Sequence, residues 1–243
     1  YSNYHMQAAA SDQVRLLGMD TVQVSTNWLQ PEENASNFAA GFRLLPYGLG
    51  GDPLRLSTTK TRDGKPGFHE QQAEYVKTGD KQYLQRPVSL EDPELRQKQA
   101  EKIASTIKVL NPFRPMGYCL GDELSTTYYV TPYDYDFSPV SLQSFRTWLQ
   151  TQYPDLAALN TEWETSFKSW DEVMPLTALE VKGRTNFAPW ADHRTYMEYA
   201  FSDYMKFVRS EIRKHDPDGR IGISGTQAAE AYGGFDWWRL AHT

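Results

Sequence analysis

Short apolar segments of strand length alternate along this chain with longer segments of helical periodicity. We predict strands over residues 20–26, 42–47, 115–122 and 220–225, preceded by a first strand near residues 1–5. Parallel strands need crossover connections long enough to hold a helix, and the intervening segments have that length. The alternation therefore predicts an α/β fold in which helices cover a parallel sheet.

Several helical segments carry start and stop signals. Asp92-Pro93-Glu94 combines a capping residue, a first-position proline and a first-turn acid, and begins a helix that we extend to Leu110. Ser138-Pro139 begins another helix. The strongest pattern covers residues 196–212 and ends at His215-Asp-Pro-Asp-Gly219. Shorter helices are predicted over residues 156–163 and 235–242.

Two further expectations concern the segments between these elements. From Gly51 to about Val88 the sequence is polar and irregular, and we predict a long loop there. Loops of that length in a compact domain are usually functional or disordered. Trp237 and Trp238, in the last helix, are predicted to lie in the core.

The predicted strand over residues 115–122 ends abruptly at two carboxylates, Asp122 and Glu123. Successive strand side chains point to opposite faces, so one carboxylate can face a pocket while the other braces the strand end. The simpler alternative is a solvated loop that opens with two charges. Chemistry in α/β folds gathers at the carboxyl ends of the strands. This position favours Glu123 as a general acid.

Polar or aromatic residues also follow the other predicted strands, among them Trp28, Tyr47 and Gln227. No Gly-x-Gly-x-x-Gly motif and no phosphate loop follows a strand, which argues against a nucleotide-binding, doubly wound sheet. We therefore predict a (β/α)8 barrel with these residues and the two carboxylates on one rim. Trp28 would be a platform for a sugar ring or, alternatively, part of the rim packing.

The composition narrows the possible partners. A net charge of −6 argues against nucleic acid, and no apolar run approaches the roughly 20 residues of a membrane span. Cys119 is the single cysteine, which excludes a disulfide within the chain and a cysteine-rich zinc site. Aromatic residues make up 14% of the chain, and such a surplus suits a site that stacks on sugar rings.

The segments Phe145–Trp163, Thr165–Phe167 and Trp170–Val173 resemble the glycoside hydrolase family 42 β-galactosidases and their relatives. The resemblance runs from Ala8 onward and is most specific over residues 115–240. It implies a retaining glycosidase of clan A on a (β/α)8 barrel, with an acid/base Glu after the fourth strand and a long helical excursion behind it. The chain would then supply roughly strands one to five.

Carried over residue by residue, the resemblance makes Glu123 the proton donor. Asp122 stands where the family has an Asn that binds the sugar 2-hydroxyl, and an ionised Asp can accept but not donate. Arg86 matches a family Arg that binds substrate. The nucleophile lies on the family's seventh strand, which leads us to expect residues 1–243 to be part of a catalytic domain that continues beyond them. Glu230 and Asp236 are the less favoured alternatives within the chain.

Two hypotheses remain open from the sequence. The first is a retaining glycoside hydrolase, and the second is a non-catalytic carbohydrate-binding or scaffold barrel. Either would have a carbohydrate as its partner, without nucleic acid, membrane, metal or cofactor, and self-association into a homo-oligomer is compatible with both. The compartment is not determined, although export is favoured because polymer-degrading relatives are commonly exported.

Overall fold

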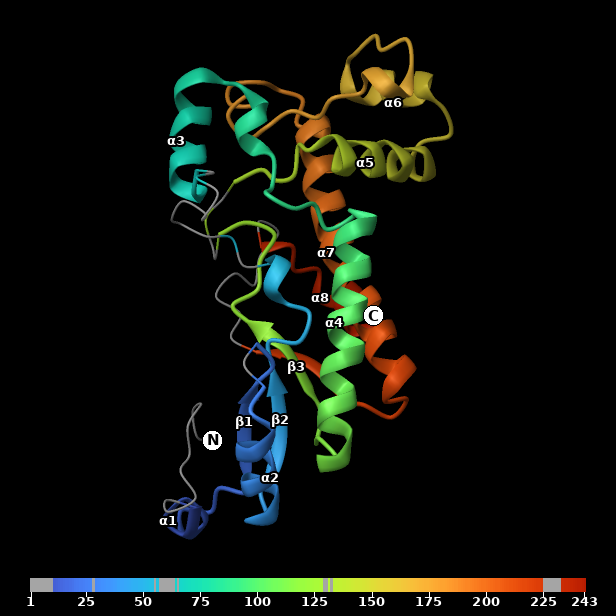
Figure 1. Cartoon of the computed structure of the whole chain (residues 1–243). Helices are drawn as coiled ribbons and strands as arrows, with labels where there is room; N and C mark the ends of the chain where they lie inside the picture. Colours follow the sequence, from blue (N-terminus) through green and yellow to red (C-terminus); the bar gives the residue numbers. More distant parts are fainter. Residues whose placement is uncertain are drawn as a thin grey trace. The chain divides into compact units, whose positions relative to one another are not determined.

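The structure, a computed structural model, describes residues 11–27, 29–54, 56, 64, 66–128, 131, 133–224 and 233–243 (Figure 1). The chain divides into two compact units. The first consists of Tyr1–Asp52, Gln97–Leu124 and Lys206–Thr226. The second consists of Pro53–Arg96, Ser125–Met205 and Gln227–Thr243.

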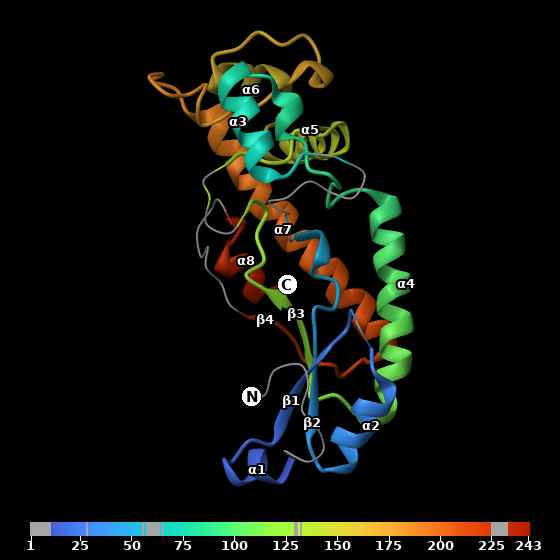
Figure 2. The ribbon, with the colours of Figure 1, turned by 60° about the vertical axis from the view of Figure 1, so that its left-hand side comes forward.

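The first unit contains a parallel four-stranded sheet in the order β1-β2-β3-β4, visible in Figures 1 and 2. The strands are β1 (Thr21–Ser25), β2 (Arg43–Tyr47), β3 (Tyr118–Asp122) and β4 (Ile221–Ser224). All three pairs of neighbouring strands are parallel, which confirms the parallel sheet predicted from the alternation of strands and helices. The expected strand near residues 1–5 lies outside the described residues.

Two short helices and a 3-10 turn accompany this sheet in the first unit. The unit contains α1 (Ser11–Leu16), α2 (Pro31–Ala39) and the 3-10 turn η4 (Asn111–Phe113). Figure 2 shows α2 alongside β1 and β2. Val22, Val24, Phe42, Leu44 and Leu110 form one buried cluster, which joins the neighbouring strands β1 and β2 to the end of a helix. Alternating β-branched and large apolar residues thus fill the sheet face, as a half-buried strand requires.

Two long helices contribute residues to both units: α4 (Pro93–Leu110) and α7 (Ala188–His215). The Asp92 carboxylate accepts a hydrogen bond from the Glu94 N–H at 2.8 Å, which confirms the predicted start of α4. The predicted apolar face of α7 is buried along its length. Its members are Met197, Phe201, Tyr204, Met205, Val208 and Ile212.

The second unit is helical. It contains α3 (Phe68–Thr78), α5 (Pro139–Gln152), α6 (Leu156–Trp163) and α8 (Trp237–Ala241), with the 3-10 turns η3 (Lys81–Leu84) and η5 (Trp170–Glu172), while the turn η2 (Asp52–Leu54) lies at the boundary. Ser138 caps α5 as predicted, accepting a hydrogen bond from the Ser141 N–H. Two apolar clusters hold the unit together, one around Tyr133 and Tyr135 and one around Phe145 and Trp163.

Two predictions from the sequence are wrong. The segment predicted as one long loop from Gly51 to about Val88 contains the 11-residue helix α3. Its buried side carries Phe68 and Tyr75, too few apolar residues to give a clear local period. Trp237 and Trp238 were predicted to be core residues, but they are 50% and 77% exposed, and the ring contacts found for them are with near neighbours in the chain, Phe235 and His242.

Candidate active site at the carboxyl end of β3

Glu123 directly follows the most deeply buried strand of the sheet. Tyr118, Cys119 and Leu120 of β3 are each less than 8% exposed, and the strand ends at the half-exposed Asp122. Glu123 has a φ of 52°, a left-handed conformation that few side chains adopt. Its N–H donates a 3.2 Å hydrogen bond to the Ser224 carbonyl of β4. The chain therefore turns sharply at Glu123 while still attached to the sheet.

Close packing around Gly121 fixes this turn from the other side. Leu124 is only 2% exposed, and a Cβ added at Gly121 would lie 2.7 Å from a Leu124 methyl carbon. Only glycine leaves room for the Leu124 side chain there. The side chain of Leu124 is anchored in the core, whereas the side chain of Glu123 is partly exposed. Glu123 can therefore present its carboxylate away from the core.

Asp122 lies beside the end of β4. It is paired in register with Ser224, whose hydroxyl donates a long hydrogen bond of 3.5 Å to Oδ1 of Asp122. The register shifts between Cys119 and Asp122, so β3 bends at its end relative to β4. The carboxylate keeps acceptor capacity beyond this single bond.

Tyr47 ends the neighbouring strand β2. It pairs with Ser25 of β1 and with Cys119 of β3, three residues before Asp122. A strand rises about 3.3 Å per residue, so β3 extends roughly 10 Å beyond the level of Tyr47. The Tyr47 carbonyl accepts hydrogen bonds from the N–H and hydroxyl of Thr26. Tyr47 and the two carboxylates thus share the carboxyl edge of the sheet at different heights.

A charged contact missed by the sequence reasoning joins the ends of β1 and β2. The Lys102 ammonium group of α4 donates to Oδ1 of Asn27 at 2.8 Å and forms an ion pair with Asp52. Asn27 also donates to Asp52 at 3.4 Å. Lys102 was hidden because it follows no strand and is one of several charged residues along α4. Trp28, next to Asn27 in the chain, and Gln227 lie outside the described residues, as does Glu230.

Arg86 belongs to the second unit and is 6% exposed. Its two terminal nitrogens donate to the carbonyls of Pro53 and Thr126, and its own N–H donates to the Asp136 carboxylate at 3.0 Å. Burial lowers the pKa of the guanidinium group. The contacts found for Arg86 tie three segments of the chain together, including one that begins three residues after Glu123. A role in substrate binding stays a prediction.

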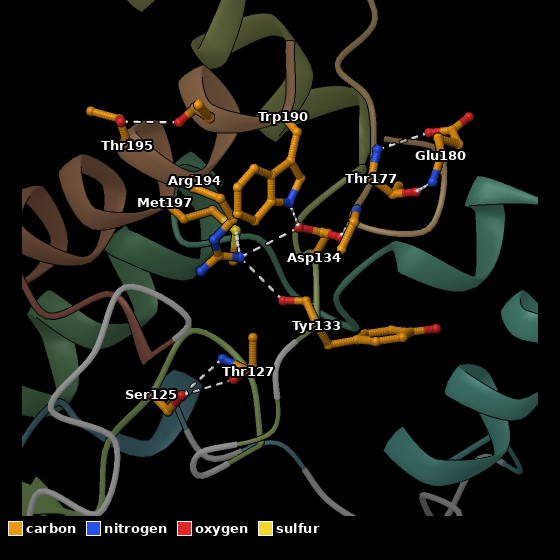
Figure 3. Close-up of polar contacts among 12 residues, drawn as sticks. Ser125, Thr127, Tyr133, Asp134, Thr177, Glu180, Trp190, Arg194, Thr195 and Met197 are labelled. Atoms are coloured by element: carbon orange, nitrogen blue, oxygen red, sulfur yellow. Dashed lines mark hydrogen bonds and ion pairs between the residues drawn. The ribbon is translucent and has the colours of Figure 1, made fainter. Parts of the chain in front are cut away.

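A second buried charged group holds the same connecting segment (Figure 3). The Asp134 carboxylate accepts hydrogen bonds from the Trp190 indole at 3.0 Å and from the Ala178 N–H at 2.8 Å. Arg194 lies 3.7 Å from it and donates to the Tyr133 carbonyl at 3.2 Å. Burial raises the pKa of the Asp134 carboxyl despite these partners. The group anchors residues 133–136 to α7, and no local sequence signal marks it.

Two other features, a metal-binding cluster and a membrane-spanning helix, are absent from the part of the chain that the structure describes. No group of three or more His, Cys, Asp or Glu side chains could hold a metal ion among the residues that the structure describes. Across the same described ranges, no helix combines the length and apolar character needed to cross a bilayer.

Solved structures with a similar fold include several glycosidases. The chain aligns with β-galactosidases from Bacillus circulans sp. alkalophilus (16% identity, TM-score 0.63, 90% of this chain and 34% of that one) and from Rahnella sp. R3 (14% identity, TM-score 0.64, 96% and 34%). It also aligns with the catalytic domain of β-amylase from Paenibacillus polymyxa (14% identity, TM-score 0.62, 97% and 69%). The described part of the chain therefore has an α/β fold, with a four-stranded parallel sheet, that is similar to part of these glycosidase structures.

The chain spans about a third of the length of the β-galactosidases that it matches. No curated protein matches it in sequence. A family model does: the β-galactosidase model of glycoside hydrolase family 42 matches residues 90–243, which is more than half of the 243 residues. The chain therefore belongs to the glycoside hydrolase family 42 β-galactosidase family.

Proposed function

We propose that this chain carries the acid/base part of the active site of a retaining glycoside hydrolase that cleaves β-galactoside-like bonds. One observation carries the proposal: Glu123 follows a buried parallel strand at its carboxyl end, in a turn fixed by Ser224 and Leu124. Catalytic groups of barrel enzymes come from this position. Membership of family 42 supports the reaction class.

In this proposal Glu123 first protonates the oxygen of the leaving sugar while a second carboxylate attacks the anomeric carbon. The glycosyl-enzyme intermediate is then hydrolysed by a water molecule that the Glu123 carboxylate deprotonates. The nucleophile must lie about 5 Å from Glu123, and we assign it to sequence outside these 243 residues. The described strands β1 to β4 would be the second to fifth strands of a (β/α)8 barrel.

Asp122, Tyr47, Trp28 and Gln227 are the proposed substrate contacts around Glu123. Asp122 can accept a hydrogen bond from a sugar hydroxyl but cannot donate one while ionised. Arg86 is also a proposed substrate contact, and the carbonyls of Pro53 and Thr126 hold its two terminal nitrogens in place. The preference of the site for galactose depends on Asp122. The family has an Asn at this position, whose NH2 group can donate a hydrogen bond that an ionised Asp cannot.

The proposal is tested with Glu123→Gln in the full-length protein. We expect the variant to fold and to bind sugar, but to lose turnover of galactosides whose leaving groups need protonation. Aryl galactosides with activated leaving groups should still form the glycosyl-enzyme, and added azide should speed its breakdown, because azide needs no general base. Asp122→Asn is the control variant: it changes the neighbouring carboxylate but keeps Glu123, so it should still hydrolyse galactosides whose leaving groups need protonation.

Normal turnover of a disaccharide by Glu123→Gln would show that the acid lies elsewhere. Absence of all hydrolysis in the wild-type protein, with sugar binding retained, would instead favour the non-catalytic carbohydrate-binding protein.

A further inference from the structure

The second unit contains a pocket of about 550 Å³ between the segment leading into α4, helix α5 and the middle of α7. This volume falls within the roughly 300–1,000 Å³ typical of small-ligand sites. Its wall combines aromatic rings with hydrogen-bonding side chains, and every lining residue belongs to the same unit. None of these residues belongs to the proposed active site around Glu123.

Three aromatic rings form one side of the pocket. Trp148 of α5 lies with its ring centroid 5.8 Å from Tyr196 and 6.5 Å from Tyr199, both on α7. Tyr196 and Tyr199 are stacked at 6.1 Å. Tyr196 is 2% exposed, whereas Tyr199 is 37% exposed, so the buried ring supports the exposed one. The guanidinium carbon of Arg239 lies over the Tyr199 ring, 5.6 Å from its centroid, so the apolar side of the pocket is provided by Trp148 and bordered by Tyr199.

The other side of the pocket is polar and already oriented. The Glu91 carboxylate accepts hydrogen bonds from the Tyr196 hydroxyl at 2.7 Å and from the Ser89 hydroxyl at 2.6 Å. Arg96 and Asp203 form an ion pair at 2.7 Å. These bonds fix both carboxylates before a ligand arrives, and each carboxylate has acceptor capacity for further hydroxyl donors. Pre-oriented groups lose less conformational entropy when they bind.

We propose that this pocket binds a neutral hexopyranose unit, with the C–H face of the sugar on Trp148, its edge against Tyr199 and its hydroxyls donating to Glu91 and Asp203. A pyranose ring has an apolar face and a hydroxyl edge, which matches the two sides of the pocket. Two carboxylates and one guanidinium leave a net charge of −1 on the wall, which disfavours carboxylated or sulfated sugars. The choice of a sugar as ligand rests on the proposed function.

The test uses the full-length protein labelled with 5-fluorotryptophan. The Trp148 fluorine signal is identified as the one missing in Trp148→Phe, and methyl β-thiogalactoside, which resists hydrolysis, is the probe. We expect the Trp148 signal to shift and to saturate with added probe. Tyr199→Ala should weaken binding about fivefold, because it removes an aromatic side chain from the wall of the pocket. Trp238→Ala, a matched exposed aromatic on α8, should leave the titration unchanged.

A Trp148 signal that stays fixed up to ~50 mM probe, far above a millimolar dissociation constant, would overturn the proposal. An unchanged titration in Tyr199→Ala would do the same. A stronger response to galacturonate than to the neutral probe would overturn the charge preference. Because the probe is not hydrolysed, these results do not depend on Glu123. If the wild-type protein does not hydrolyse galactosides, the proposed function is refuted. The Trp148 titration then still shows whether the pocket binds a sugar.

Discussion

At the scale of single residues, the backbone sets the direction of the proposed acid. Glu123 has a left-handed φ of 52°, a conformation that costs a non-glycine residue about 1–3 kcal/mol. The hydrogen bond to Ser224 and the buried side chain of Leu124 hold the chain in this conformation. Such conformations persist where the surrounding structure over-determines them, and they cluster at functional sites. The direction of the Glu123 side chain therefore depends on both Ser224 and Leu124.

Asp122 gives the residue-scale prediction. In Asp122→Asn the amide oxygen can still accept from Ser224, and the new NH2 group can donate to a sugar hydroxyl. One added neutral hydrogen bond contributes about 1 kcal/mol, so we expect kcat/KM for an aryl β-galactoside to rise about fivefold. Steady-state kinetics at one pH measure this. Asp122→Ala is the comparison that removes both functions. Equal or lower kcat/KM in the Asn variant would mean that the substrate itself supplies the donor to this position.

At the scale of elements, the loop after β2 is seated directly on β3. A Cβ at Gly51 would overlap the Leu120 carbonyl oxygen, which is main chain and cannot move aside independently. One at Gly50 would lie 2.7 Å from a Val208 methyl carbon. The glycines at Gly50 and Gly51 thus allow the loop to approach the strand that leads to Glu123. The loop then continues to Asp52 and its ion pair with Lys102.

We expect Gly51→Ala to lower the free energy of unfolding by about 2–4 kcal/mol, since the overlap must be relieved by a backbone shift. Gly222→Ala is the matched control, because a Cβ at that position of β4 meets no atom within 4 Å. Its effect should stay within about 0.5 kcal/mol. Urea denaturation of both variants measures the difference. Equal midpoints for the two variants would show that the loop is not seated against β3 as described.

At the scale of the whole molecule, acid stability should depend on one buried histidine. His193 is 0% exposed between the rings of Phe137 and Phe145, at centroid distances of 4.7 and 5.4 Å. Burial lowers its pKa to about 3. Below its ordinary pKa of about 6.5, the unfolded chain binds a proton that the folded chain does not. The contribution of His193 to stability is therefore complete above pH 6.5 and is lost as the pH falls toward 3.

Between pH 7.5 and 5.5 this difference amounts to about 1.4 kcal/mol of unfolding free energy. Burial raises the pKa of Asp134 and of Asp136, which acts in the opposite direction, so the wild-type curve alone does not isolate His193. We expect His193→Leu to lose about 1.4 kcal/mol less than the wild-type protein over this range. His215→Gln, at an exposed position, should follow the wild-type curve. Parallel curves for all three proteins would mean that His193 does not contribute.

Many elements of the described fold could be predicted from local sequence patterns. The apolar runs of β1 to β4, the capped start of α4 at Asp92 and the start of α5 at Ser138 were predictable, because strand period and helix caps depend on residues a few positions apart. The position of Glu123 after the buried strand was predictable for the same reason.

Other features were decided only by tertiary contacts. Helix α3 forms because Phe68 and Tyr75 join a buried cluster with Tyr133 and Tyr135, more than 50 residues away in the chain. Arg86 donates hydrogen bonds to carbonyls that lie 33 and 40 positions away in the chain. The pocket at Trp148 is lined by residues from three separate segments. A local sequence pattern records which side of an element is apolar. It does not record which distant segment will cover that side, because burial of apolar surface is non-directional and the partner is chosen by how the folded chain packs.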